Sequence, residues 1–154
     1  MEAGLEQLLT NLGVASAMVA LTVSMHFWGL LWLTRVVNGG AERLRPHEAA
    51  HRAAIVILIG VFGVFALHTA EIWLYAALYG VLAETRTLEE ALYFSTVTFA
   101  SLGYGDIVLS SRWRLVSAIE AANGVILFAW STAFLMTLTR RLKLLEHDWL
   151  ERGR

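Results

Sequence analysis

Three long apolar stretches and one shorter one divide the chain into four predicted helices. Residues 7–34 carry no formal charge, and this run exceeds the roughly 20 residues that cross a bilayer as a helix. A second apolar stretch covers residues 53–70, and a third, residues 115–139, is interrupted only by Glu120. The pattern predicts three membrane-spanning helices, with a short uncharged segment at residues 91–100 between the last two.

Turn and capping signals set the expected boundaries. Pro46 suits the first position of a helix, and Thr87 followed by two acidic residues is typical of a helix N-terminus. In chain order, we expect a first span at 1–37, a cytoplasmic loop at 38–51, an outer helix at about 46–79, a short helix at about 88–100, an inner helix at about 113–140 and a cytoplasmic tail at 143–154.

The composition agrees with a membrane protein. Hydrophobic residues make up 57% of the 154 residues, and charged residues only 16%. The net charge of −1 excludes a generally basic nucleic-acid-binding protein, and the absence of cysteine excludes disulfides and thiolate metal sites. We therefore expect no nucleic-acid partner.

Basic residues predict the orientation of the spans. Four arginines lie near the first connection and five basic residues follow the third span, against three in the remaining connection. The positive-inside rule then predicts that the first loop and the C-terminus are cytoplasmic, and that the N-terminus and the segment before the third span are outside.

The segment Ser101-Leu102-Gly103-Tyr104-Gly105-Asp106 lies in this outer connection. A dehydrated cation needs a ring of oxygen atoms in place of its water shell, and glycine permits the φ values that aim successive carbonyls toward one axis. One chain supplies one strip of carbonyls, so a ring requires several copies around a symmetry axis. The sequence therefore predicts an oligomeric cation pore.

With these elements in place, residues 52–142 resemble the potassium-channel pore-loop family, whose filter is usually Thr-Val-Gly-Tyr-Gly-Asp. The resemblance implies an all-α integral membrane protein with a re-entrant pore helix and filter, assembled as a homotetramer. It implies a potassium-selective channel, with lipids and potassium ions as partners and no cofactor or enzymatic activity. Small chains of this kind resemble bacterial ones, which implies the inner (plasma) membrane.

The same resemblance assigns roles to the six residues of the strip. Ser101 would coordinate potassium through its carbonyl and hydroxyl, and Leu102, Gly103 and Tyr104 through their carbonyls. Gly105 would let the strip turn outward, and Asp106 would lie at the outer mouth. Two residues depart from the family pattern, because Ser101 lacks the β-methyl that stiffens threonine and Leu102 replaces valine. A non-selective monovalent cation channel is therefore the alternative function.

The inner span carries a further group of predicted functional residues. Gly124 lies where many such channels bend, and it serves either as a gating hinge or as a site of close helix packing. Helical spacing places Val125, Phe128 and Thr132 on one face, and the resemblance implies that this face lines the cavity below the filter, with Phe128 narrowing the path.

Ionisable residues within spans call for a specific explanation. We expect Glu71 or Glu120 to brace the filter from behind or to sense external pH, and the alternative is an interhelical hydrogen bond without regulation. His26 is expected to be a packed, hydrogen-bonded histidine. Ser131 is expected to bond its own helix.

A zinc-peptidase motif competes with the pore interpretation. His47-Glu48-Ala49-Ala50-His51 fits the pattern of two zinc-binding histidines and a catalytic glutamate, and Glu71 follows as a third ligand. On one continuous helix, 20 residues separate His51 from Glu71 by about 30 Å, too far for one metal. A non-conducting membrane subunit or scaffold is a third class that ion flux would distinguish.

Overall fold

The computed structural model describes residues 2–41 and 49–141, and within these ranges every regular element is a helix. Helix α1 spans Glu2–Ala41, α2 spans Ala49–Val81, α3 spans Leu88–Phe99 and α4 spans Arg114–Arg141. Three of them contain segments long and apolar enough to cross a membrane: Gly4–Gly39, Ala54–Val81 and Arg114–Arg140. The predicted all-α integral membrane fold is confirmed.

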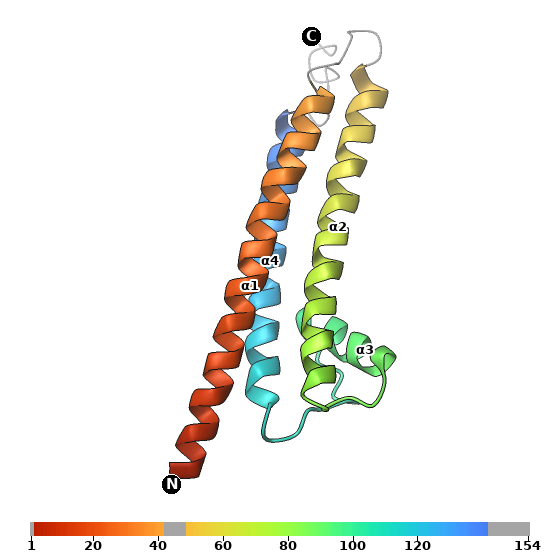
Figure 1. Ribbon diagram of the computed structural model, residues 1–154. Coiled ribbons are helices and arrows are strands. Elements are labelled where there is room, and N and C mark those ends of the chain that lie inside the picture. The colour runs from red at the N-terminus through yellow and green to blue at the C-terminus, as the bar shows by residue number, and fades with distance from the viewer. Residues whose placement is uncertain (1, 42–48, 142–154) are drawn as a thin grey trace, which may run out of the picture.

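The long helices α1, α2 and α4 run alongside one another, and the short α3 lies beside the C-terminal part of α2, at the end of the bundle where α1 begins (Figure 1). The helix bounds agree with the expected ones to within a few residues. Residues 42–48 and the tail at 143–154 fall outside the described residues.

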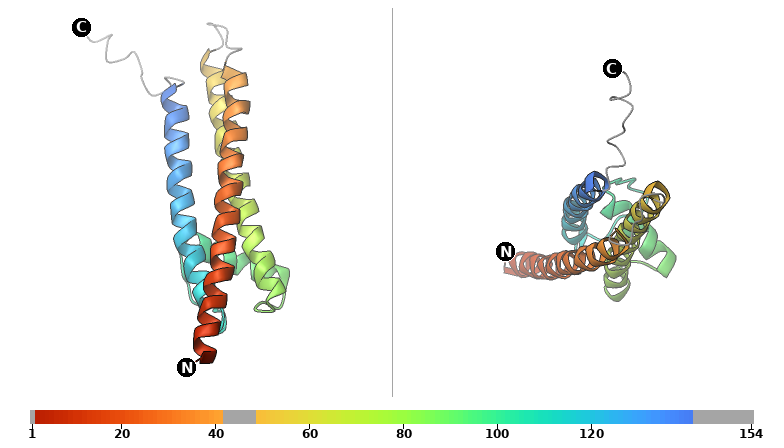
Figure 2. Two further views of the ribbon diagram at one scale, coloured as in Figure 1. Left: turned by 60° about the vertical axis from the view of Figure 1, so that its left-hand side comes forward. Right: turned by 90° about the horizontal axis from the view of Figure 1, so that it is seen from above.

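Helix α1 packs on both α2 and α4, and it is inclined across them (Figure 2). Leu67 of α2 covers Gly29 of α1, and Leu33 of α1 covers Gly63 of α2. A Cβ at Gly29 would lie 2.7 Å from the Leu67 side chain, and one at Gly63 would lie 2.6 Å from that of Leu33. Small residues let helices approach closely in a membrane, so this reciprocal pair fixes α1 against α2.

The apolar core at the α3 end contains two tyrosines that sequence reasoning would place at the membrane surface. The spacing of Trp73, Tyr75 and Tyr79 suggests an interfacial aromatic belt. Tyr75 and Tyr79 are instead fully buried, and only Trp73 is exposed. Their rings pack against aromatic side chains of α3, because α2 turns this face toward the short helix.

Candidate functional site

The strip at residues 101–106 begins where α3 ends, and hydrogen bonds fix that end. Thr87 caps the N-terminus of α3 by accepting from the backbone N–H of Glu90. At the other end, the N–H of Leu102 bonds the carbonyl of Val97 and the N–H of Ser101 bonds the carbonyl of Thr98. These two bonds form a Schellman motif, which requires a left-handed residue just past the helix.

Ser101 is that residue, with φ of 57° at a position where glycine is usual. Gly103 and Gly105 also have positive φ, at 59° and 77°, whereas Leu102 and Tyr104 do not. The strip therefore alternates in the sign of φ. Such alternation turns successive peptide groups the same way, unlike a β-strand, in which they point to opposite sides.

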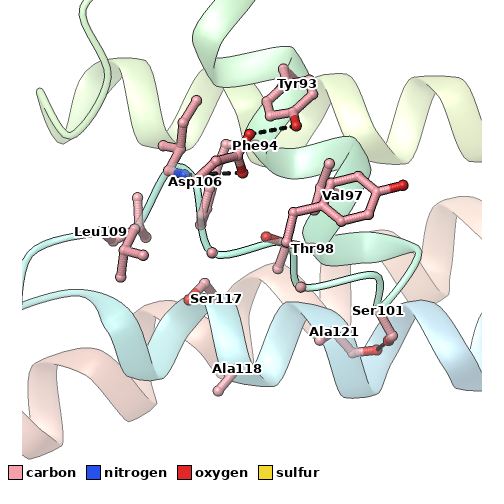
Figure 3. Close-up of a pocket in the computed structure, with 15 residues that line it drawn as sticks. Tyr93, Phe94, Val97, Thr98, Ser101, Asp106, Leu109, Ser117, Ala118 and Ala121 are labelled. Atoms are coloured by element: carbon pink, nitrogen blue, oxygen red, sulfur yellow. Dashed lines mark hydrogen bonds between the residues drawn. The ribbon is translucent and has the colours of Figure 1, made fainter.

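The strip is exposed along its whole length in the single chain. It borders a hollow of about 330 Å³ that is lined also by side chains of α3 and α4 (Figure 3). Leu102 is 54% and Tyr104 is 66% exposed, although both are large apolar side chains. An exposed apolar surface of this kind marks a contact with another molecule.

Helix α4 supports the strip from one side. The Ser101 hydroxyl donates to the carbonyl oxygen of Ala121 at 3.2 Å. A Cβ at Gly124 would lie 2.1 Å from the carbonyl oxygen of Phe99, the last residue of α3. Gly124 thus permits close packing between the inner helix and the end of α3, as one of the two sequence interpretations expected, and its role as a hinge stays a prediction.

Asp106, the last residue of the strip, is hydrogen-bonded to α3. The hydroxyl of Tyr93 donates to Oδ2 of Asp106 at 2.6 Å (Figure 3). This hydrogen bond lowers the pKa of Asp106 below its ordinary value and raises the pKa of Tyr93, so the donor stays protonated and the acceptor ionised. Sequence reasoning missed this pair, because the two residues are 13 positions apart and no local pattern joins them.

Glu120 connects three helices behind the strip. Its carboxylate accepts from the hydroxyl of Ser95 on α3 at 2.6 Å and from the hydroxyl of Tyr79 on α2. Ser95 and Glu120 are both fully buried. Of the two acids expected as a filter brace, Glu120 is the one in contact with α3.

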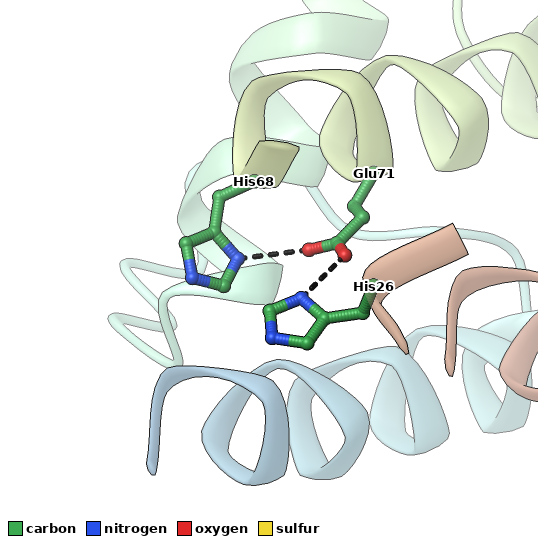
Figure 4. Close-up of side chains that lie close together, drawn as sticks. All are labelled: His26, His68 and Glu71. Atoms are coloured by element: carbon green, nitrogen blue, oxygen red, sulfur yellow. Dashed lines mark hydrogen bonds and ion pairs between the residues drawn. The ribbon is translucent and has the colours of Figure 1, made fainter. Parts of the chain in front are cut away.

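Glu71 lies in a different environment. It bonds His26 of α1 and His68 of α2, each at 2.8 Å between Nδ1 and a carboxylate oxygen (Figure 4). His26 is therefore packed and hydrogen-bonded, as expected. The expectation for Ser131 is wrong, because its hydroxyl lies 2.9 Å from Nε2 of His68 rather than bonding its own helix.

The predicted cavity face of α4 is largely exposed in the single chain, although the ring of Phe128 also contacts His68 of α2. Val125 is 53% exposed, and Phe128 and Thr132 are also exposed. The ring of Phe128 contacts that of Phe99 at 5.4 Å between centroids, at the level where α3 ends. These residues therefore lie on a surface continuous with the base of the strip.

The zinc-peptidase motif is not brought together with Glu71. His47 and Glu48 fall outside the described residues. The backbone of α2 is one continuous helix from Ala49 to Val81, so positions 51 and 71 are separated by about 30 Å along its axis. Glu71 instead pairs with His26 and His68.

Comparison with known proteins identifies one family. A family model described as an ion channel matches residues 54–141, which covers most of α2 together with α3 and α4 and leaves α1 outside. No curated protein and no solved structure matches the chain.

Proposed function

Since this chain belongs to the ion channel family, we propose that it forms a homotetrameric pore that conducts potassium ions passively across a membrane. The ions would bind to the carbonyls of Ser101, Leu102, Gly103 and Tyr104 and to the hydroxyl of Ser101. Gly105 and Asp106 would form the outer mouth. Conduction down a gradient needs no cofactor and no enzymatic chemistry.

The observation that carries the proposal is the alternating φ of the strip. With positive φ at positions 101, 103 and 105, successive carbonyl oxygens of the strip can face one side. A row of carbonyl oxygens replaces the hydration shell of potassium only when rows from several chains surround the ion. The exposure of the strip in one chain supports assembly around a common axis.

The end of α3 adds to this arrangement. The helix ends at Phe99, directly before the strip, and its C-terminus carries the negative end of the helix dipole. A cation near the base of the strip is favoured by this charge. Phe128 and Thr132, exposed on α4, would then line the water-filled path beneath it.

The charge distribution supports a definite orientation. The strip lies at the end of the bundle where α1 begins (Figure 1), and the helices carry Arg35, Arg52, Arg140 and Arg141 toward the other end. The N-terminus and the strip would therefore be outside and the C-terminus cytoplasmic, in a bacterial inner membrane.

A non-selective monovalent cation channel is the second candidate function. Ser101 offers the coordinating hydroxyl without the β-methyl of threonine, and its hydroxyl bonds the carbonyl of Ala121. A more flexible ring of Ser101 oxygens, one from each chain, would discriminate less well between potassium and sodium.

The test is ion flux by purified protein in liposomes. We expect the protein to dissipate a potassium gradient, to be blocked by barium and to show a reversal potential that follows potassium. Gly103→Ala should abolish flux because it places a side chain at a φ of 59°, whereas Gly80→Ala, which meets no atom within 4 Å, should retain it.

Three outcomes separate the candidate functions. A reversal potential that follows sodium as strongly as potassium would establish the non-selective channel. Absence of flux from correctly assembled protein would favour the scaffold. Zinc-dependent proteolysis that is lost in Glu48→Gln would establish the peptidase.

A further inference from the structure

A buried cluster of two histidines and one glutamate joins α1 to α2, apart from the strip. Nδ1 of His26 lies 2.8 Å from one carboxylate oxygen of Glu71, and Nδ1 of His68 lies 2.8 Å from the other (Figure 4). His26 and Glu71 are fully buried and His68 is 7% exposed. One potential ligand atom from each residue lies within 4.8 Å of the other two.

Two imidazole nitrogens and a carboxylate form a ligand set that suits divalent first-row transition metals, zinc among them. Zinc–nitrogen and zinc–oxygen bonds of about 2.0–2.2 Å place the ligand atoms of a tetrahedral site about 3.3 Å apart. To surround an ion, the pairs that are now 2.8 Å apart would need to separate by about 0.5 Å, and ligand atoms as far apart as 4.8 Å would need to approach by about 1.5 Å. Side-chain rotation alone can supply such a movement.

The third helix contributes a hydrogen-bonding group suited to this site. The Ser131 hydroxyl of α4 lies 2.9 Å from Nε2 of His68 and 3.3 Å from Nε2 of His26. Histidines that bind a metal through one nitrogen almost always donate the other N–H to a nearby oxygen. Ser131 offers one oxygen, with two lone pairs, to both rings.

Hydrogen-bond counting favours the metal-bound arrangement. When both Nδ1 atoms donate to Glu71, both Nε2 atoms of neutral rings face Ser131 as acceptors. A hydroxyl has one proton, so one Nε2 lacks a donor unless its ring carries a second proton. When a metal takes both Nδ1 lone pairs, both protons lie on Nε2 and the Ser131 oxygen accepts both.

We propose that His26, His68 and Glu71 bind a divalent transition-metal ion of the zinc type inside the bundle, with Ser131 orienting both rings. The ion fastens α1, which lies outside the family match, to the α2–α4 pore region. The proposal concerns metal binding and does not depend on whether the chain conducts ions.

The test measures zinc in the full-length protein, purified in detergent without a histidine tag. After incubation with zinc and removal of free metal, elemental analysis should find one zinc per chain. All variants are made in a protein that already carries His47→Ala/His51→Ala, because the motif that contains these histidines could hold zinc independently. In this background, His26→Ala/His68→Ala and Glu71→Gln should lose the zinc, whereas the matched carboxylate variant Glu120→Gln should keep it.

Ser131 provides a readout specific to ring orientation. Ser131→Ala should weaken zinc affinity by roughly 10- to 100-fold, as is typical when a partner of a metal-binding histidine is removed. Ser131→Thr, which keeps the hydroxyl, should restore it. Equal zinc affinity in all three proteins would exclude the proposed role of Ser131.

A spectroscopic measurement keeps the proposal testable if the histidine variants fail to fold. Zinc-edge X-ray absorption of the His47→Ala/His51→Ala protein should show two imidazole nitrogens and carboxylate oxygen at about 2.0–2.2 Å. Less than stoichiometric zinc in this background protein, or a spectrum without two imidazoles, would overturn the proposal. Undiminished zinc in a folded His26→Ala/His68→Ala protein would do the same.

Discussion

Gly124 of α4 lies directly against the carbonyl oxygen of Phe99 at the end of α3, at a distance that leaves no room for a side chain. A Cβ at this position would lie 2.1 Å from that oxygen and 2.9 Å from the carbonyl carbon. The neighbouring atoms belong to the backbone of α3, so they cannot rotate away as a side chain would. Close packing of α4 against the end of α3, next to the strip, therefore requires glycine at this position.

We predict that Gly124→Ala displaces the end of α3 and destabilises the protein by about 1–3 kcal/mol, the range typical of overpacking. Thermal unfolding in detergent and potassium flux should both be impaired. Gly80→Ala is the matched control, because that helical glycine has no atom within 4 Å and alanine favours the helix. A hinge role would instead reduce opening without loss of stability.

Glu120 is predicted to hold α3 through its two hydroxyl partners. Glu120→Ala leaves the buried hydroxyl of Tyr79 without its acceptor, at about 1–3 kcal/mol, whereas the Ser95 hydroxyl keeps the carbonyl of Ile72 as an acceptor. Glu120→Gln, which keeps one oxygen, should lose less. Unfolding free energies of Ser95→Ala, Glu120→Gln and the double variant give the coupling between them, and strict additivity would show that the hydrogen bond does not contribute.

Tyr93 is predicted to set the acid sensitivity of the strip. Its hydrogen bond lowers the pKa of Asp106, so the stabilisation from ionised Asp106 is present above the ordinary aspartate pKa and is lost as the pH falls through the lowered value. Tyr93→Phe removes this stabilisation and returns the pKa toward its ordinary value, so Asp106 should become protonated, and flux should respond to acid, at a higher pH. Flux measured against external pH, with Asp106→Asn as the control that lacks the titrating group, tests the shift. Identical profiles for wild type and Tyr93→Phe would contradict it.

Phe128 is predicted to narrow the path below the strip. Its side chain is exposed on α4 and its ring contacts Phe99. Phe128→Ala should change single-channel conductance or open probability in planar bilayers. Ile126→Ala, an exposed apolar residue on another face of the same helix, is the control, and unchanged currents in Phe128→Ala would remove Phe128 from the conduction path.

The sequence predicted the helices well, because apolar runs and a threonine cap act locally. It also located the strip, because glycines permit positive φ wherever they occur. The hydrogen bonds between helices were harder to predict. Helical spacing places His68 and Glu71 on one face of α2, but nothing in it indicates that His26, 45 positions before Glu71, completes the cluster.

The tyrosines of α2 show why such features escape sequence reasoning. A tyrosine near the end of a span suits an interfacial belt and a buried polar contact equally well. Which of the two occurs depends on the face of α2 that is turned toward the other helices. The partners of Tyr79 come from α3 and α4, which a pattern within α2 cannot reveal. The left-handed conformation of Ser101 was missed for a similar reason, since no glycine marks the position.

Helix α1 also reaches the loop between α3 and α4, where the side-chain amides of Asn11 and Gln7 donate to the carbonyl oxygen of Arg112 at 2.8 and 3.2 Å. These hydrogen bonds near the start of α1 and the contacts of His26 further along it hold the helix at two separate positions. Helix α1 therefore packs as one unit with α2 and α4. Truncation at residue 54, where the family match begins, would expose the apolar faces of α2 and α4 that α1 covers, and it would remove His26 from Glu71 while leaving His68 in place.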